Sequence, residues 1–128
     1  CPLAWDGAWH LDPEAVRHLI VVDVRRKGRL ADFSQVVDRA ERGEVEVTIY
    51  DHHPAADDDL RADRLFVEVV GSATTLLVER IDAAGLAVDE VEATLWALGI
   101  HADTGSLTFG DGDCERPRPA EGKVSALR

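Results

Sequence analysis

The sequence predicts an α/β fold in which a mainly parallel sheet carries flanking helices. Three short apolar runs rich in β-branched residues alternate with stretches in which apolar residues recur at helical spacing, and this alternation is typical of βαβ units. Ligands of such sheets gather at the carboxyl ends of the strands. The 128 residues, 45% of them hydrophobic, are enough for one domain with its own core.

The three strands are predicted over residues 19–24, 45–50 and 65–70, where each apolar run is bounded by charged residues or turn formers. The first helix follows a cationic turn and is predicted over residues 30–40, because apolar side chains recur there every three or four positions. Gly43 lies where that helix should end.

Two more helices are predicted after the third strand. One begins at Gly71-Ser72 and closes at Gly85. The next begins at Asp89, which can form a capping box with Glu92 three residues later. Its spacing predicts a buried stripe of Val91, Leu95 and Leu98, flanked by Trp96.

Charge and cysteine content narrow the functional classes. The chain has 14 Lys and Arg against 25 Asp and Glu, and this net charge of −11 argues against broad, nonspecific binding to nucleic acid or anionic lipid. The sequence contains no run of about 18 consecutive apolar residues, which is the length that would span a membrane. Cys1 and Cys114 lie far apart without C-x-x-C spacing, which indicates a reducing compartment, so we expect a cytoplasmic protein.

Acidic and histidine residues fall where the predicted elements end. Asp23 closes the first strand, Asp51-His52-His53 follows the second, and Asp103 ends the third helix. Carboxylates at these exits are badly placed for core packing but well placed to hold a divalent cation. Mixed Asp and His ligands suit Mn²⁺, Fe²⁺, Co²⁺ or Zn²⁺ better than Ca²⁺, and Mn²⁺ is our first choice. Adjacent histidines in an extended loop point to opposite sides, so one can bind metal while the other meets substrate.

Each of these residues also has an ordinary structural explanation. A strand-end aspartate such as Asp23 is more often a cap or a turn residue, and Asp103-Thr104-Gly105 fits a turn that closes a helix. A His-His pair can lie in a solvated loop. Their joint position at the exits of a parallel sheet favours a metal site.

Four segments in order resemble the DHH phosphoesterase superfamily, which includes RecJ-type nucleases, oligoribonucleases, cyclic-dinucleotide phosphodiesterases, exopolyphosphatases and family II pyrophosphatases. The similar segments are Val21-Val22-Asp23 with Arg29-Leu30, the signature Tyr50-Asp51-His52-His53-Pro54, the helix start Gly71-Ser72-Ala73-Thr74-Thr75, and Leu98-Gly99-Ile100 with Asp103-Thr104-Gly105. The resemblance spans about Leu19 to Phe109. It looks closest to the DHH modules fused to bacterial tRNA nucleotidyltransferases or polyA polymerases.

The resemblance implies a role for each matching acidic or histidine residue. Asp23 would bridge two divalent metals, and His52 and Asp103 would complete the shell of one of them. His53 would contact the scissile phosphate or the leaving group. Asp51 would orient the His52 ring, since a metal-bound imidazole usually donates its second N–H to a carboxylate.

Cationic and hydroxyl side chains would contact the substrate. Arg29, together with Ser72 or Thr74, would steady phosphate oxygens in the resembled family. Arg25, Arg26 and Lys27 could also contact phosphate, but a solvated turn between strand and helix is the favoured interpretation for these three.

The sequence departs from the family pattern in two places. The first motif, a His-x-Asp-x-Asp segment on an earlier strand, has no counterpart before Asp23, because Asp12-Pro13 in the nearest string, His10-Leu11-Asp12-Pro13, indicates a helix start. The smaller substrate-binding domain expected after the fourth motif is also missing. We therefore expect residues 1–109 to be a partial DHH-type domain without the first motif, and residues 110–128 to be a loosely ordered C-terminal tail.

Two functions from different classes follow from these patterns. The first is a manganese-dependent phosphoesterase that hydrolyses phosphodiester or phosphoanhydride bonds of a nucleotide, a short oligonucleotide or another phosphorylated small molecule, with Mg²⁺ as the alternative ion and one of two metal sites incomplete. The second is a noncatalytic nucleotide- or metal-binding module, or a scaffold, in a larger RNA-processing protein. An oligomer is compatible with either.

Overall fold

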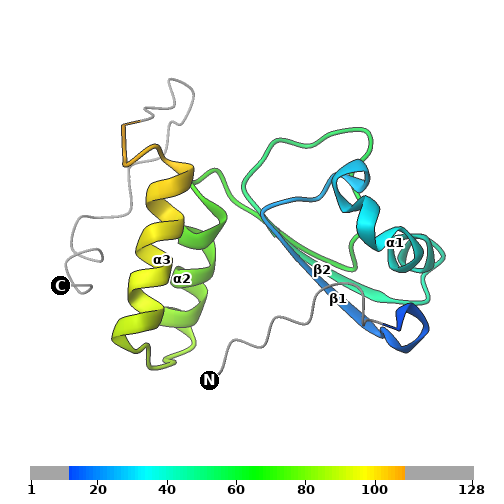
Figure 1. Ribbon diagram of the computed structural model, residues 1–128, viewed down its shortest axis with the longest axis horizontal. Coiled ribbons are helices and arrows are strands. Elements are labelled where there is room, and N and C mark those ends of the chain that lie inside the picture. The colour runs from blue at the N-terminus through cyan, green and yellow to red at the C-terminus, as the bar shows by residue number, and fades with distance from the viewer. Residues whose placement is uncertain (1–11, 109–128) are drawn as a thin grey trace.

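The computed structural model describes residues 12–108, which form a three-stranded parallel sheet with helices on both sides (Figure 1). The strands are β1 (His18–Val22), β2 (Glu46–Asp51) and β3 (Arg64–Val67), in the order β1-β2-β3. Both pairings are parallel, so the carboxyl ends of the strands meet at one edge. The predicted α/β class is confirmed. The tail predicted at 110–128 lies outside the described residues.

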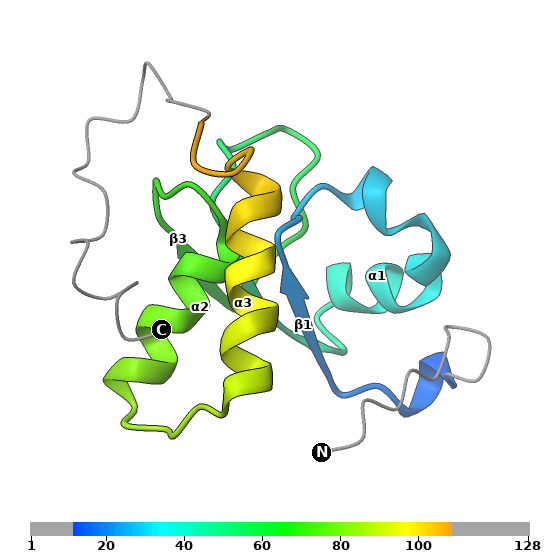
Figure 2. The same ribbon diagram turned by 60° about the vertical axis from the view of Figure 1, so that its left-hand side comes forward.

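The helices are divided between the two faces of the sheet. Helix α1 (Ser34–Glu41) lies on one side, and the paired helices α2 (Ala73–Ala83) and α3 (Glu90–Asp103) lie on the other (Figures 1 and 2). The first helix was predicted to begin at Leu30, but the chain there forms the 3-10 segment η3 (Lys27–Phe33). A kink at Leu30, with φ −104° and ψ 24°, separates the two halves of η3 and delays the regular helix.

Local sequence signals set the helix ends. The Ser72 hydroxyl caps α2 by accepting from the N–H of Thr75, and the predicted capping box of Asp89 and Glu92 is present at the start of α3. Gly43 and Gly85, after α1 and α2, adopt φ of 77° and 67°. A side chain is disfavoured in this left-handed region, so glycine fits both helix exits.

The hydrophobic core lies between α1 and one face of the sheet. It is formed by side chains from β1, α1, β2 and the loops beside them: Val21, Val37, Ala40, Val45, Val47, Ile49 and Leu60. Alternation along β2 explains the pattern, because Val47, Ile49 and Asp51 share one face and Thr48 and Tyr50 the other. The same alternation brings Asp51 to the core side of the sheet edge.

Substitutions on the two faces of the sheet should have unequal effects. Ile49 is 0% exposed, so we expect Ile49→Ala to lower the free energy of unfolding by about 2–5 kcal/mol through lost burial and a residual cavity. Ile20, on the other face, is 59% exposed, so Ile20→Ala should lower it by less than about 1 kcal/mol. Urea unfolding of both variants measures the difference, and equal losses would contradict this core.

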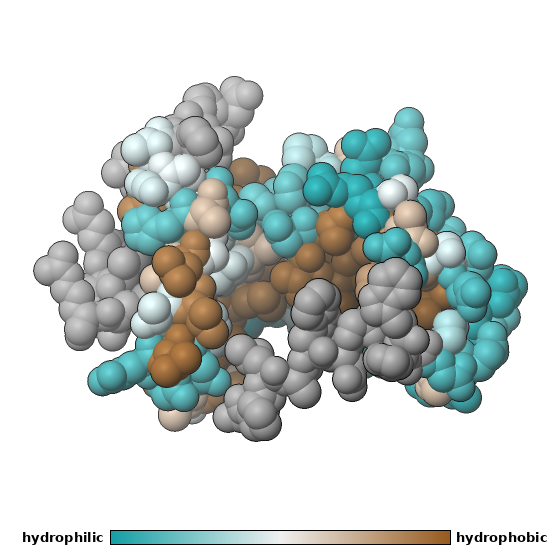
Figure 3. All heavy atoms as spheres, viewed as in Figure 1, coloured by the Kyte–Doolittle hydropathy of each residue, from teal (hydrophilic) through white to brown (hydrophobic). Residues whose placement is uncertain are grey.

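The apolar stripe of α3 was predicted to be buried, but in the structure it is exposed. Val91, Leu95 and Leu98 are 68%, 48% and 61% exposed. Helix α3 instead contacts α2 through another face, where Gly99 lies so close to Thr74 that a Cβ atom there would be 2.8 Å from the Thr74 hydroxyl. Figure 3 shows hydrophobic surface over α3 and over the neighbouring part of the sheet. Within residues 12–108, no helix combines the length and the apolar character needed to cross a membrane.

Candidate metal centre

Asp23 occupies a special backbone position at the carboxyl end of β1. Its φ is 64°, in the left-handed region that aspartate and asparagine tolerate better than most residues. Its backbone N–H still donates to the carbonyl of Tyr50 on β2, over 2.9 Å. The chain therefore turns sharply directly after the last ladder bond, and the Asp23 side chain leaves the regular strand pattern at this edge.

Four side chains gather at this edge of the sheet. Asp23, Asp51, His52 and His53 each offer one ligand atom, and these atoms all lie within 4.8 Å of one another. Asp51 ends β2, and the two histidines follow it directly. Residues 28 positions apart in the sequence, Asp23 and Asp51, are thus brought to one place by the parallel pairing of β1 with β2.

The His52 ring presents its second nitrogen to Asp23. Nδ1 lies 2.9 Å from the carbonyl oxygen of Val70, which can only accept, so Nδ1 carries a hydrogen and donates it. Nε2 lies 3.1 Å from Oδ1 of Asp23. When the His52 ring is neutral, its Nε2 is an acceptor, and so is Oδ1 of Asp23. The lone pairs of two acceptors at this distance repel each other unless a proton or a cation lies between them. A ring fixed by an N–H bond to a carbonyl, with the other nitrogen beside a carboxylate, fits a divalent metal site.

Replacing Asp23 by asparagine should show whether a proton or a metal ion accounts for the contact between His52 Nε2 and Asp23 Oδ1. The amide of Asp23→Asn can donate to the His52 Nε2 lone pair and tolerates the left-handed backbone, so stability without metal should stay or rise by about 1 kcal/mol. The wild-type chain should gain about 2.7 kcal/mol from Mn²⁺ at 100 times its dissociation constant, and the variant should gain almost nothing. Thermal melts with and without Mn²⁺ measure both effects. An undiminished metal-induced gain in the variant would contradict the site.

Asp51 holds the His53 ring rather than the His52 ring. The side chain of Asp51 is fully buried, and its Oδ1 accepts from His53 Nδ1 at 2.7 Å and from the backbone N–H groups of His52 and His53. Burial alone would raise the pKa of the Asp51 carboxyl, but these hydrogen bonds outweigh it and hold the pKa below its usual value. The expectation that Asp51 orients His52 is corrected, since the carbonyl of Val70 takes that position.

Asp103 lies outside the group of four. It is exposed at the last position of α3. The next residue, Thr104, touches the loop between β3 and α2, where a Cβ atom on Gly71 would be 2.9 Å from its methyl group. Val70, whose carbonyl holds His52, directly precedes that glycine. The end of α3 therefore lies against the loop that supports His52, and the ligand role of Asp103 stays a prediction.

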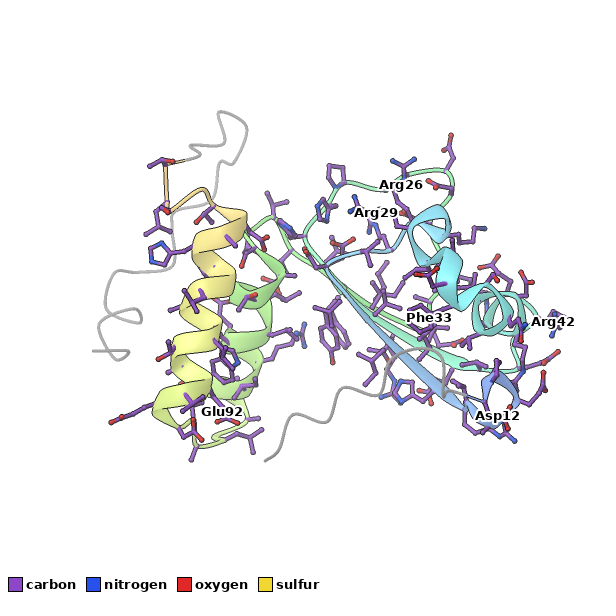
Figure 4. The ribbon with its side chains drawn as sticks, viewed as in Figure 1. Asp12, Arg26, Arg29, Phe33, Arg42 and Glu92 are labelled. Carbon is purple, nitrogen blue, oxygen red and sulfur yellow. The ribbon has the colours of Figure 1, made fainter. Side chains whose placement is uncertain are left out.

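The side chains predicted to contact phosphate differ in their exposure and in their contacts within the protein. Ser72 is fully buried and its hydroxyl caps α2, while Thr74 packs against Gly99 of α3. Ser72 thus serves as a helix cap and Thr74 contributes to the contact between α2 and α3, and their contact with substrate phosphate stays a prediction. Arg29 is exposed in η3, and Figure 4 shows it with Arg26 beside the loop that follows β2.

Asp12 is used as a helix cap. Its side chain accepts from the N–H of Glu14 and caps the short helix η2 (Pro13–Ala15), as its sequence context predicted. This helix precedes β1 and lies at the opposite end of the sheet from the start of η3 (Figure 4). His10 lies outside the described residues.

Two partners in this centre were not anticipated. The carbonyl of Val70 gives no sequence signal, because every residue carries the same backbone acceptor. Arg25 was expected in a solvated turn, but it is only 6% exposed. A buried, ionised aspartate such as Asp51 needs a cation near it, and that requirement could have indicated an arginine on the neighbouring strand exit.

Comparison with known proteins gives the chain a context. No family model matches it. An A-adding tRNA nucleotidyltransferase of Geobacter sulfurreducens is 41% identical over 99 residues, a match that covers 77% of this chain and 11% of that protein. An A-adding tRNA nucleotidyltransferase of Aquifex aeolicus is 43% identical over 63 residues, or 49% of this chain and 7% of that protein. The chain therefore spans about a tenth of the length of the curated relatives it matches. The resemblance to the DHH superfamily stays a prediction.

Proposed function

We propose that this chain is a partial DHH-type phosphoesterase domain of a longer RNA-processing protein, and that it hydrolyses phosphodiester or phosphoanhydride bonds of nucleotides or short oligonucleotides with the help of a divalent metal. The contact between His52 Nε2 and Asp23 Oδ1 carries the proposal, because these two potential ligand atoms lie 3.1 Å apart. The hydrogen bond from His52 Nδ1 to the Val70 carbonyl already fixes the orientation of the ring. Mn²⁺ is the ion we favour for this mixed donor set, and Mg²⁺ is the alternative.

Asp23 and His52 would hold the ion, with Asp103 as the further ligand that we propose for it. A bound divalent ion supplies Lewis acidity toward phosphate oxygens and toward the attacking water. The carbonyl of Val70 keeps His52 in the tautomer whose Nε2 can bind metal. The sharp turn at Asp23 presents the carboxylate to that nitrogen.

His53 would act on the substrate. Asp51 accepts from Nδ1 of its ring, and the side chain is 54% exposed, which leaves Nε2 available to solvent and substrate. In the neutral ring Nε2 is an acceptor, so donation to a phosphate oxygen or proton delivery to the leaving oxygen uses the imidazolium form, in which both ring nitrogens carry a hydrogen. Arg29, exposed beside the same loop, would neutralise charge on the phosphate, for which a guanidinium is suited.

The tRNA-processing relatives support the choice of substrate class. Both relatives are named A-adding tRNA nucleotidyltransferases, and the chain matches a segment of each. We propose that this domain acts on nucleotides or short oligonucleotides in the same context. The net charge of −11 makes a small, locally recognised substrate a better fit than long nucleic acid bound nonspecifically.

A noncatalytic metal- or nucleotide-binding module is the second candidate. The observation that favours it is the use of Asp12 as a helix cap, which leaves the first motif without a counterpart in residues 12–108. The four grouped side chains then suffice for one ion but not for two. Under this alternative the sheet edge binds metal tightly and no hydrolysis follows.

Hydrolysis assays of the full-length gene product test the proposal. We expect release of product from a linear dinucleotide or a nucleoside diphosphate in the presence of Mn²⁺, and its loss after chelation with EDTA. Tight binding of one ion per chain without hydrolysis of either substrate would favour the noncatalytic module. Equal rates with Mn²⁺ and with EDTA would reject a metal-dependent phosphoesterase.

A further inference from the structure

Arg25 lies buried beneath the loop that carries the two histidines. It is 6% exposed, whereas the side chain of its neighbour Arg26 is 60% exposed and pairs with Asp58 at the surface. Burying a guanidinium is unfavourable unless hydrogen bonds and opposite charges compensate it. A guanidinium buried as deeply as that of Arg25 therefore needs carboxylates or hydrogen-bond acceptors close to it.

The guanidinium of Arg25 joins the two ends of that loop. Nη2 donates to the backbone carbonyl of His53 over 2.9 Å. Nε lies 2.9 Å from Oδ2 of Asp59, at the far end of the loop, and 3.7 Å from Oδ2 of Asp51, at its beginning. The backbone around Arg25 adds to the connection, since its carbonyl accepts from the N–H of Leu60 over 2.7 Å.

These contacts reach the His53 ring by two routes. One passes through the carbonyl of His53 itself, which fixes the backbone that carries the ring. The other passes through Asp51, whose Oδ2 faces Arg25 while Oδ1 accepts from His53 Nδ1 over 2.7 Å. Oδ2 of Asp51 and Nε of Arg25 are both buried without a hydrogen-bond partner, so the two groups stabilise each other through the attraction of opposite charges at 3.7 Å.

We propose that Arg25 is a positioning residue that sets the tautomer and the orientation of the His53 ring. The role of that ring in hydrolysis rests on the function proposed above. An arginine suits this position because Nη2 donates to the His53 carbonyl while Nε lies beside the carboxylates of Asp51 and Asp59, whereas a lysine carries its charge on one nitrogen, which cannot occupy both of these positions. The effect of Arg25 should therefore be on turnover, not on metal binding at Asp23 and His52.

Arg25→Lys tests the proposal, with Arg26→Lys as the matched control on an exposed ion pair. The ring ¹⁵N shifts of His53, measured by NMR on the chain at pH 8, should move from a single tautomer toward an average in Arg25→Lys and stay unchanged in Arg26→Lys. In the full-length gene product, kcat of Arg25→Lys should fall about 10- to 100-fold, with KM and Mn²⁺ affinity within about twofold of wild type.

Unchanged His53 shifts and an unchanged kcat in Arg25→Lys would overturn the proposal. If that variant does not fold, Asp59→Asn releases the same guanidinium from a carboxylate that is partly exposed, and it should shift the His53 signals in the same direction by a smaller amount. Unchanged signals in Asp59→Asn would then overturn the proposal. If the signals move but the wild-type gene product hydrolyses no phosphoester, the proposed function fails while the positioning of His53 by Arg25 stands.

Discussion

Asp23→Ala and His52→Ala should each lower Mn²⁺-dependent hydrolysis by the full-length gene product about a thousandfold. Either change removes one of the two ligand atoms that lie 3.1 Å apart at the centre of the site. A metal contributes several kcal/mol of charge stabilisation in the transition state, and each 1.36 kcal/mol corresponds to a tenfold change in rate. Initial rates at saturating and at limiting Mn²⁺ measure the loss.

Asp57→Ala provides the control for these two variants. Asp57 is the exposed member of the acidic run at residues 57–59, whose other two carboxylates are half-buried and pair with Arg26 and Arg25. Its removal should leave both rate and metal dependence unchanged. Undiminished hydrolysis in both Asp23→Ala and His52→Ala would exclude this edge of the sheet as the reaction site.

His53→Ala should slow turnover by about 10²- to 10⁴-fold, the usual contribution of a positioned acid or base. The ring is more than half exposed and hydrogen-bonds to Asp51, so it is free to meet substrate. Mn²⁺ affinity should stay within about threefold of wild type, because Asp23 and His52 remain. Steady-state kinetics and a metal titration on the same preparation separate the two effects.

His18→Ala is the matched control for this histidine. His18 starts β1, at the opposite end of that strand from Asp23, and its ring bonds to the hydroxyl of Thr48 over 2.9 Å. Turnover of this variant should equal that of the wild type. A loss of metal binding in His53→Ala would show that the ring is a ligand and would contradict the substrate role.

The fold could be predicted from the sequence where the signal is local. Each of the three β-branched runs contains a strand, but β1 and β3 end at Val22 and Val67, before the predicted ends. Ile20 and Leu65 are exposed, so the continuous apolar runs predicted the strands without predicting which face is covered. Asp89 with Glu92 caps α3, and Gly43 and Gly85 end the preceding helices, because these motifs depend on neighbouring residues alone.

Features that depend on tertiary packing could not be predicted. Helical spacing places Val91, Leu95 and Leu98 on one stripe, but spacing does not say which face α2 will cover, and the stripe is exposed. The burial of Arg25 depends on Asp51 and Asp59, which lie 26 and 34 positions away. The sequence placed Asp23 and His52 at one sheet edge, but it named Asp51 instead of the Val70 carbonyl as the support of His52.

Calorimetric titration of Mn²⁺ into the wild-type chain and into His52→Ala tests the central claim most directly. That claim is that the carboxylate of Asp23 and Nε2 of His52 together hold a divalent ion. We expect one ion to bind the wild-type chain and heat of binding to vanish in the variant. Absence of binding to the wild-type chain, or equal affinity in both proteins, would contradict the claim.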